Sequence, residues 1–270
     1  WQNVRLIASG AAYIKDVFIV PNLRDNTATF NLEIDHTEIK GAEIGIKINL
    51  LDAEHRRITV KEKIKVHPGL NAHKIVVNIP DTQYWSPDTP NLYCVKITIE
   101  NEGLFSDYWS ERFGMRELTI RNKDFYLNGK RIYIKASFFE GLYPNGIAFP
   151  DSEEMARKEI RLAKEAGFNM IRPWRHPTTP MWLDLADEMG IMVVGSPALE
   201  CMGLPLSTPY LPSRVTNEVK ETILKDRNRA CIVQWELFNE LHRPVLNQRL
   251  GPMAMLAREL DPTRLILDES

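Results

Sequence analysis

The sequence predicts a multidomain protein of the β and α/β classes, in which an all-β part precedes a part where strands and helices alternate. Its 270 residues correspond to roughly two domains at about 150 residues per domain. Apolar and polar residues alternate with a period of two up to about residue 112, whereas short apolar runs alternate with helical patterns from residue 113 onward. This change of pattern divides the chain into residues 1–112 and residues 113–270.

Four alternating runs predict the strands of the first domain. They lie at residues 29–34, 44–50, 58–60 and 92–99. Turn-forming residues stand before the first run at 24–26, between the third and fourth at 67–69, and after the last at 101–103. One apolar face per strand is typical of a half-buried antiparallel sheet. Short strands at this spacing, over about a hundred residues, predict an immunoglobulin-like β-sandwich.

Five apolar runs with helical patterns between them predict the second domain. The runs lie at residues 131–137, 168–172, 191–194, 231–238 and 265–267. Asp151 or Ser152 can cap the first helix, and Gly167 ends it. Further helices are predicted at residues 181–189, which Gly190 ends, at 214–226 and near 250–260. Apolar strands that alternate with helices predict a parallel sheet covered by helices.

Two folds fit this alternation, a (β/α)8 barrel and a doubly wound sheet. The sequence has no glycine-rich phosphate loop after any predicted strand, which disfavours the nucleotide-binding form of the doubly wound sheet. A barrel closes only when all of its eight strands are present, and the sequence accounts for five. If the domain is a barrel, we therefore expect this chain to hold about half of it.

Composition and charge exclude several classes of function. Hydrophobic residues make up 44% and charged residues 26% of the chain, as in a folded protein rather than a disordered one. The 34 basic and 36 acidic residues give a net charge of −2, so we expect no nucleic-acid partner. The longest apolar runs, of about ten residues, are too short to span a membrane. The three cysteines, Cys94, Cys201 and Cys231, lack the spacing of a metal site, and we expect no bound metal.

Polar and aromatic side chains gather where the predicted strands end. In a parallel α/β sheet the carboxyl ends of the strands meet at one edge, and active sites form there. In chain order, these residues are Glu140, Arg172, Trp174, Arg175, His176, Glu200, Asn239 and Glu240. We therefore expect them to line one site that combines carboxylates, cations and aromatic rings.

Glu240 is the candidate catalytic residue, because it follows the fourth apolar run and partial desolvation there raises a carboxyl pKa towards the range of a general acid. Asn239 offers a donor and an acceptor that suit a sugar hydroxyl, and Arg172 suits a partner carboxylate. Three of the predicted site residues also have a structural interpretation. Glu240 can cap the next helix or pair with Arg243, Arg172 can form a surface ion pair, and Trp174 can pack under a loop instead of stacking on a sugar.

Several segments, at residues 84–93, 113–116, 125–130, 167–172 with 185–190, and 227–240, follow one another in a characteristic order and spacing. Together they resemble glycoside hydrolase family 2 over nearly the whole chain. The resemblance implies an immunoglobulin-like β-sandwich followed by the first half of a (β/α)8 TIM barrel. It also implies a retaining, exo-acting β-glycosidase, similar to β-galactosidases, β-glucuronidases and β-mannosidases, with a carbohydrate substrate. By this resemblance Glu240 is the acid/base and Asn239 contacts the substrate 2-hydroxyl.

The same resemblance implies that the chain is part of a longer enzyme. The nucleophile of the family is a glutamate on a later strand, beyond Ser270, so we expect this chain alone to be inactive. Residues 1–6 resemble the last strand of the sugar-binding domain that precedes the sandwich in the family. The first and fifth barrel strands would then be open edges, which leaves room for a homo-oligomer.

Several positions depart from the pattern of the family. Arg175 and His176 stand where a histidine and a tyrosine are common, and Glu140 falls near another usual histidine. Glu200 matches a glutamate that helps to ligate magnesium in some members, but Met202 replaces the accompanying histidine and a thioether is a poor magnesium ligand. We therefore expect no magnesium or other cofactor. These changes also keep a second function open, that of a non-catalytic carbohydrate-binding or scaffold relative.

Overall fold

The computed structural model describes residues 4, 6–139, 141–174, 178–197, 199, 208–241 and 244–270. These residues form two compact units, one of Trp1–Thr82 with Leu92–Met115 and the other of Gln83–Asn91 with Arg116–Ser270. In the sequence, the short segment Gln83–Asn91 lies between the two parts of the first unit, but it packs in the second unit. None of the described helices combines the length and the apolar character needed to cross a membrane.

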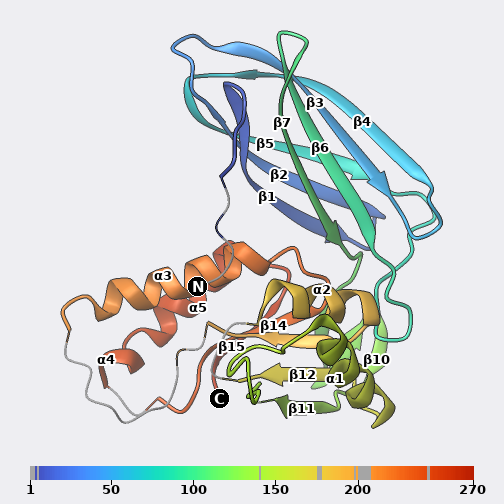
Figure 1. Ribbon diagram of the computed structural model, residues 1–270, viewed down its shortest axis with the longest axis vertical. Coiled ribbons are helices and arrows are strands. Elements are labelled where there is room, and N and C mark those ends of the chain that lie inside the picture. Colours follow the sequence, from blue (N-terminus) through green and yellow to red (C-terminus); the bar gives the residue numbers. More distant parts are fainter. Residues whose placement is uncertain are drawn as a thin grey trace. The chain divides into compact units, whose positions relative to one another are not determined.

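The first unit is a β-sandwich of two antiparallel sheets (Figure 1). One sheet has the order β1 (Ala12–Asn22), β2 (Thr27–His36) and β5 (Gly69–Asn78). The other has the order β4 (Arg57–Val66), β3 (Ala42–Leu51), β6 (Tyr93–Asn101) and β7 (Leu104–Phe113). Three of the four predicted runs fall within one of these strands and the fourth, 92–99, begins one residue before β6, so the predicted sandwich is confirmed.

Alternate side chains of the strands fill the space between the two sheets. In β2 these include Phe30, Leu32 and Ile34, all of which are buried. Phe30 meets Phe113 of β7 edge to face, with the ring centroids 6.0 Å apart and the ring planes at 87°. The period of two that the sequence shows is therefore the period of this core.

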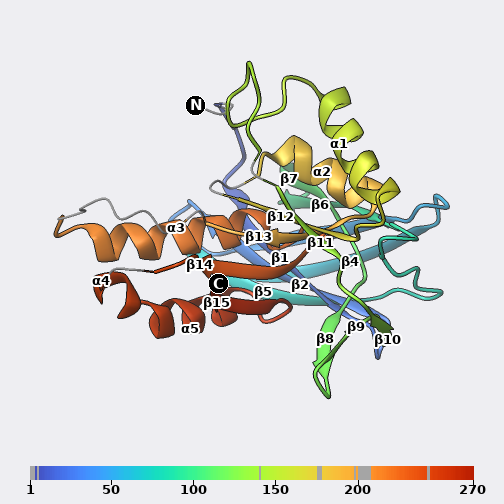
Figure 2. The same ribbon diagram turned by 90° about the horizontal axis from the view of Figure 1, so that it is seen from below.

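The second unit is built on a five-stranded parallel sheet (Figures 1 and 2). Its strands are β11 (Ala136–Phe139), β12 (Met170–Pro173), β13 (Met192–Gly195), β14 (Ile232–Phe238) and β15 (Leu265–Glu269). They lie side by side in chain order, and every neighbouring pair is parallel. A doubly wound sheet reverses its strand order at a switch point. This sheet does not reverse, and it corresponds to the first half of a barrel.

Helices connect the successive strands of this sheet. They are α1 (Glu153–Glu165), α2 (Pro180–Met189), α3 (Leu211–Asp226), α4 (Pro244–Asn247) and α5 (Leu250–Leu260). Ser152 is the N-cap of α1, and its side chain accepts a hydrogen bond from the Met155 N–H at 3.2 Å. Gly190 ends α2 in a left-handed conformation with φ 73°, which glycine adopts without strain. Both of these predicted helix limits are confirmed.

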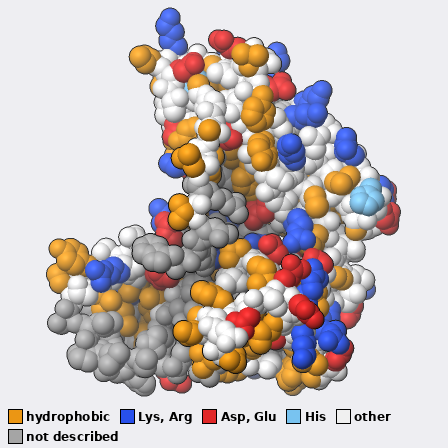
Figure 3. Space-filling view, in the orientation of Figure 1, with side chains coloured by type: hydrophobic (Ala, Val, Ile, Leu, Met, Phe, Trp, Pro, Cys, Tyr) orange, Lys and Arg blue, Asp and Glu red, His pale blue; other side chains and the backbone are white. Residues whose placement is uncertain are grey.

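The faces of α1 and α2 carry acidic and basic side chains close together (Figure 3). Arg157 of α1 donates to Glu153 at 2.8 Å within the helix and to Glu188 of α2 at 3.0 Å. Solvent-exposed ion pairs contribute little to stability. This mixed surface of α1 and α2 is therefore a solvated face of the unit and not a candidate active site.

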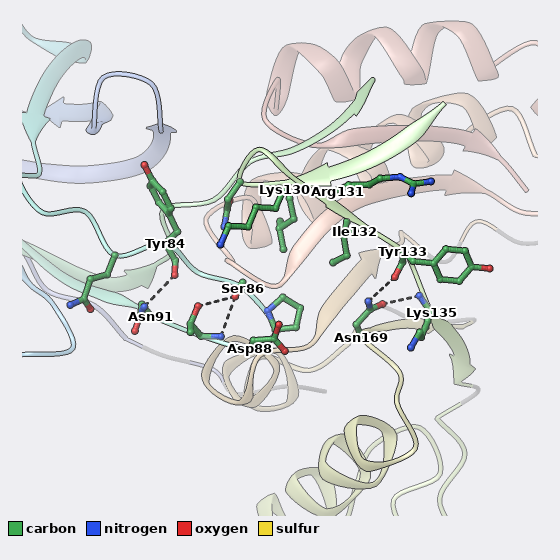
Figure 4. Close-up of a pocket in the computed structure, with 15 residues that line it drawn as sticks. Tyr84, Ser86, Asp88, Asn91, Lys130, Arg131, Ile132, Tyr133, Lys135 and Asn169 are labelled. Carbon is green, nitrogen blue, oxygen red and sulfur yellow. Dashed lines mark hydrogen bonds between the residues drawn. The ribbon is translucent and has the colours of Figure 1, made fainter. Parts of the chain in front are cut away.

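The strand predicted at residues 131–137 is wrong, because two sheets divide this run. Its first part belongs to β10 (Lys130–Ile132), which pairs with β9 (Asp124–Leu127) and, through it, with β8 (Leu118–Arg121) in an antiparallel sheet. Its last part begins β11. Between them, the Asn169 side chain accepts a hydrogen bond from the Lys135 N–H at 2.8 Å and donates one to the Tyr133 carbonyl at 2.9 Å (Figure 4). A side-chain amide thus occupies backbone groups that a continuous strand would use.

A buried charged pair supports the sheet from the end of α5. Asp261, which follows α5, lies 3.3 Å from Nε of Arg264, and both side chains are almost fully buried. The indole N–H of Trp235 on β14 donates to the same carboxylate at 2.8 Å. The Asp261 carboxylate therefore joins α5 to the strand that carries the candidate catalytic residues.

Candidate active site

Arg172, on β12, is the centre of a hydrogen-bonded cluster that involves three strands. Its Nε donates to Oε2 of Glu236 on β14 at 2.5 Å, and its Nη2 donates to Oε1 of the same carboxylate. Nη2 also donates to Oδ1 of Asn239 at 2.6 Å and to Oγ of Ser270 at 2.8 Å. One guanidinium thus connects the carboxyl ends of β12, β14 and β15.

The ion pair of Arg172 and Glu236 lies at the boundary between core and solvent. The Glu236 side chain is 1% exposed and the Arg172 side chain is 26% exposed. The hydrogen bond to Glu236 raises the pKa of Arg172, burial opposes this, and the charges of Glu236 and Glu240 raise the pKa further. Arg172 therefore carries a full positive charge, and its partner is a buried carboxylate. The surface ion pair considered for Arg172 is not what the structure contains.

Two aromatic rings flank the Arg172 guanidinium. Its carbon lies 5.0 Å from the ring centroid of Trp174 and 5.8 Å from that of Phe138 on β11, within the range of cation–π contacts. Trp174 is 7% exposed and packs in this cluster, whereas Phe138 is 53% exposed. The ring that the cluster offers to solvent is therefore mainly that of Phe138.

Glu240 stands directly after β14, at the same end of the sheet. Its side chain is exposed, so the partial desolvation expected from its place at the strand end is wrong. Its charge is one of those that raise the pKa of Arg172, so the two groups are electrostatic neighbours. Its backbone is left-handed, with φ 47°, and its N–H donates to the Ser270 carbonyl at 2.9 Å. Such a conformation is uncommon for residues other than glycine and is concentrated at functional sites. It turns the chain away from the strand at the residue that carries the carboxyl group.

Asn239 and Glu269 complete the described part of this edge. Asn239 is 6% exposed, and its N–H donates to the Leu199 carbonyl at 3.2 Å. The Glu269 carboxylate accepts a hydrogen bond from the Leu241 N–H at 2.8 Å. The backbone on both sides of Glu240 is thus held against the ends of neighbouring strands.

The structure brings together four of the eight residues that the sequence predicted for the site. Arg172, Trp174, Asn239 and Glu240 lie at one edge of the sheet, as the preceding distances show. The other four, Glu140, Arg175, His176 and Glu200, lie outside the described residues, as do Met202 and Arg243. Among the residues that are described, no group of three or more His, Cys, Asp or Glu side chains is arranged to hold a metal ion.

Three residues of the cluster, Glu236, Ser270 and Phe138, were not predicted. A signal for Glu236 is present in the sequence, because it is an acidic residue within the apolar run of β14, and a buried carboxylate requires a partner. Ser270 and Phe138 give no comparable signal. A serine after a strand and one aromatic residue in an apolar run are common in any α/β domain.

A cavity of about 800 Å³ lies at the opposite end of the sheet (Figure 4). Residues of the segment Gln83–Asn91 and of β10 line it, together with Lys135 and Asn169, which precede β11 and β12. None of the clustered site residues lines this cavity. The amino ends of barrel strands contribute to stability rather than to catalysis, so we place the candidate active site at the Arg172 cluster.

Comparison with known proteins identifies the family. The profile described as "Glycosyl hydrolases family 2" matches residues 12–116, and that described as "Glycosyl hydrolases family 2, TIM barrel domain" matches residues 118–270. The chain belongs to glycosyl hydrolase family 2. The resemblance inferred from the sequence motifs is therefore confirmed, as is the fold, a β-sandwich followed by the first half of a TIM barrel.

Several proteins are similar to this family 2 chain over most of its length. A β-galactosidase of Staphylococcus xylosus is 25% identical over 93% of the chain, and one of Thermoanaerobacterium thermosulfurigenes is 26% identical over 98%. The solved structure of a Bacteroides uniformis β-glucuronidase covers 96% of the chain at 21% identity, with a TM-score of 0.82. The chain spans 26%, 37% and 34% of the lengths of these three proteins.

Proposed function

We propose that the chain is the central part of a retaining, exo-acting β-glycosidase in which Glu240 is the general acid/base. The observation that carries the proposal is the arrangement at the end of β14. Glu240 there leaves the strand on a left-handed backbone beside the charged Arg172, and Asn239 is fixed next to it. Membership of glycosyl hydrolase family 2 supports this assignment.

In this mechanism Glu240 transfers one proton in each of two steps. As an acid, it protonates the glycosidic oxygen while a second carboxylate attacks the anomeric carbon and forms a covalent glycosyl-enzyme. As a base, it then removes a proton from the water that releases the sugar. The two carboxyl groups of a retaining enzyme stand about 5 Å apart. We propose that the nucleophile comes from sequence beyond residue 270, so that the chain by itself does not turn over substrate.

The substrate proposed is a β-linked galactoside or glucuronide. The names of the similar proteins, β-galactosidase and β-glucuronidase, support this choice. Asn239 would contact the 2-hydroxyl of the sugar, and the substrate would also meet Arg172, Trp174, Arg175, His176, Glu200 and Glu140. We propose no metal or other cofactor for the reaction.

The decisive variant is Glu240→Gln in the full-length protein that carries this chain. An aryl β-glycoside with a poor leaving group needs the proton, so its kcat/KM should fall by about 10²–10⁴-fold. A dinitrophenyl glycoside leaves without protonation, and its kcat/KM should stay close to that of the wild type. The exposed Glu259→Gln on α5 is the matched control and should change neither value.

Two outcomes would overturn this assignment. Wild-type turnover of the poor-leaving-group substrate by Glu240→Gln would show that Glu240 is not the acid. A wild-type protein that binds aryl β-glycosides without hydrolysing them would instead support the non-catalytic, carbohydrate-binding relative.

A further inference from the structure

The Glu236 carboxylate is the one charged group of the cluster that solvent scarcely reaches. It is 1% exposed, and it accepts two hydrogen bonds from Arg172 and one from the Ser270 hydroxyl at 2.6 Å. A carboxylate at this depth is costly without a partner, and an apolar residue in the same strand would avoid that cost. The presence of Glu236 therefore calls for an explanation other than stability.

The paired carboxylate fixes the plane of the Arg172 guanidinium. Two nitrogens of the group, Nε and Nη2, face the two oxygens of Glu236. Because a guanidinium is planar and its N–H directions are rigid, this contact also fixes the direction of the remaining Nη2 hydrogen. That hydrogen is directed at Asn239 Oδ1, 2.6 Å from Nη2, and at Ser270 Oγ, 2.8 Å away. The rings of Trp174 and Phe138 limit how far the group can tilt.

Arg172 in turn decides which way the Asn239 amide faces. A guanidinium has donors only, so Asn239 must present its oxygen and not its nitrogen to it. The Ser270 hydroxyl lies 3.0 Å from the same oxygen, but its single hydrogen cannot be donated there while it is donated to Glu236. The amide nitrogen of Asn239 therefore points away from the cluster, where it is available to an acceptor on a bound molecule.

We propose that Glu236 is a positioning residue, which acts through Arg172 to turn the amide nitrogen of Asn239 towards the sugar hydroxyl beside the reacting carbon. The inference rests on the proposed function, in which Asn239 contacts that hydroxyl. Its consequence is that the site reads the hydroxyl as a hydrogen-bond acceptor, and that Glu236, which touches no substrate atom itself, sets this selectivity.

The test compares two aryl β-glycosides that differ only at carbon 2, one with the hydroxyl and one deoxy, on the full-length protein. Glu236→Gln keeps the shape of the side chain, removes its charge and places an N–H₂ group against an Arg172 N–H. We expect the ratio of the two kcat/KM values to fall about tenfold, the equivalent of one hydrogen bond. The rate on the deoxy substrate should change little.

Asp261→Asn is the matched control, because Asp261 is another buried carboxylate that pairs with an arginine of the same unit. It should leave the ratio unchanged. Equal losses on both substrates in Glu236→Gln would make Glu236 merely structural and overturn the inference, while the wild-type turnover would leave the proposed function standing. If Glu236→Gln does not fold, Glu236→Asp, which keeps the charge at a shorter reach, is judged by the same ratio.

A crystal structure of the Glu236 variant tests the inference without reference to turnover. We expect the Asn239 amide to rotate or to lose its contact with Arg172. An Asn239 side chain that keeps its orientation would overturn the inference even if the protein hydrolyses nothing. An absence of hydrolysis by the wild type would instead count against the proposed function.

Discussion

Arg172 and Glu236 depend on each other, because each neutralises a charge that the other leaves at the edge of the core. Arg172→Met should lower the free energy of unfolding by about 3 kcal/mol, since it leaves the Glu236 carboxylate buried and unpaired. The double variant Arg172→Met/Glu236→Leu removes both charges and should recover much of this loss. Urea unfolding of the two variants and the wild type gives the comparison. A single variant as stable as the wild type would contradict the pairing.

At the scale of residues, the sequence predicts where side chains gather but not which of them pair. The ends of the apolar runs locate Arg172, Asn239 and Glu240 at one edge of the sheet, because the parallel arrangement makes strand ends coincide. The Arg172–Glu236 pair depends on the lateral distance between β12 and β14, with β13 between them. That distance is a property of the sheet and has no trace in the local pattern.

At the scale of elements, the Asp261 carboxylate holds the end of α5 against β14 and makes stability depend on pH. Burial raises the pKa of Asp261, but the charge of Arg264 and the hydrogen bonds from Thr263 and Trp235 lower it more, so the pKa of this carboxyl is lowered overall. A depressed carboxyl pKa contributes stability that is fully present above the unfolded-state pKa and is lost as the pH falls through the folded-state pKa. The destabilisation caused by Asp261→Asn should therefore be largest near neutral pH and should shrink below about pH 4.

Urea unfolding of the wild type and Asp261→Asn across this pH range measures the effect. The difference between their unfolding free energies should decrease on acidification. A difference that is the same at pH 7 and at pH 3 would show that the Asp261 charge does not act as described.

Element limits are predictable from sequence where a local chemical signal fixes them. Ser152 caps the start of α1 with its side chain, and Gly190 ends α2 in a left-handed backbone conformation. The prediction of one strand over residues 131–137 is wrong because the apolar residues continue through a point where the side chain of the distant Asn169 bonds to the backbone groups. A contact between residues more than thirty positions apart cannot be seen in the period of either segment.

At the scale of the whole molecule, the two outer strands of the parallel sheet are unprotected compared with the outer strand β4 of the sandwich. The edge strand β4 carries Lys61, Lys63 and Lys65 on its exposed face, a device that prevents pairing between molecules. The outer strands β11 and β15 consist mostly of apolar residues. The 270-residue chain expressed alone should therefore self-associate, either as aggregates or as an oligomer that covers these edges.

Sedimentation velocity over a range of concentrations measures this behaviour. We expect species larger than one chain, and a sharper distribution when the flanking sequence of the full-length protein is included. A monodisperse monomer that unfolds in a single cooperative transition would contradict the prediction.

The fold class follows from the sequence at this scale, but the choice between two α/β folds does not. The change from a period of two to alternating strands and helices predicts a sandwich and a parallel sheet. Strand order distinguishes a barrel from a doubly wound sheet, and the same local patterns are compatible with either order. The resemblance to the family favours the barrel over the doubly wound sheet. The strand order from β11 to β15 agrees with a barrel.

In the proposed function, the Glu240 side chain is the proton donor and acceptor of the site. Chemical rescue of Glu240→Ala in the full-length protein tests it most directly, with azide added to an activated aryl β-glycoside. Azide needs no general base, so we expect it to restore kcat and to give the β-glycosyl azide, the product of attack on a covalent glycosyl-enzyme. Formation of the α-glycosyl azide would identify Glu240 as the nucleophile, and a lack of any azide effect on a fully active variant would remove Glu240 from the mechanism.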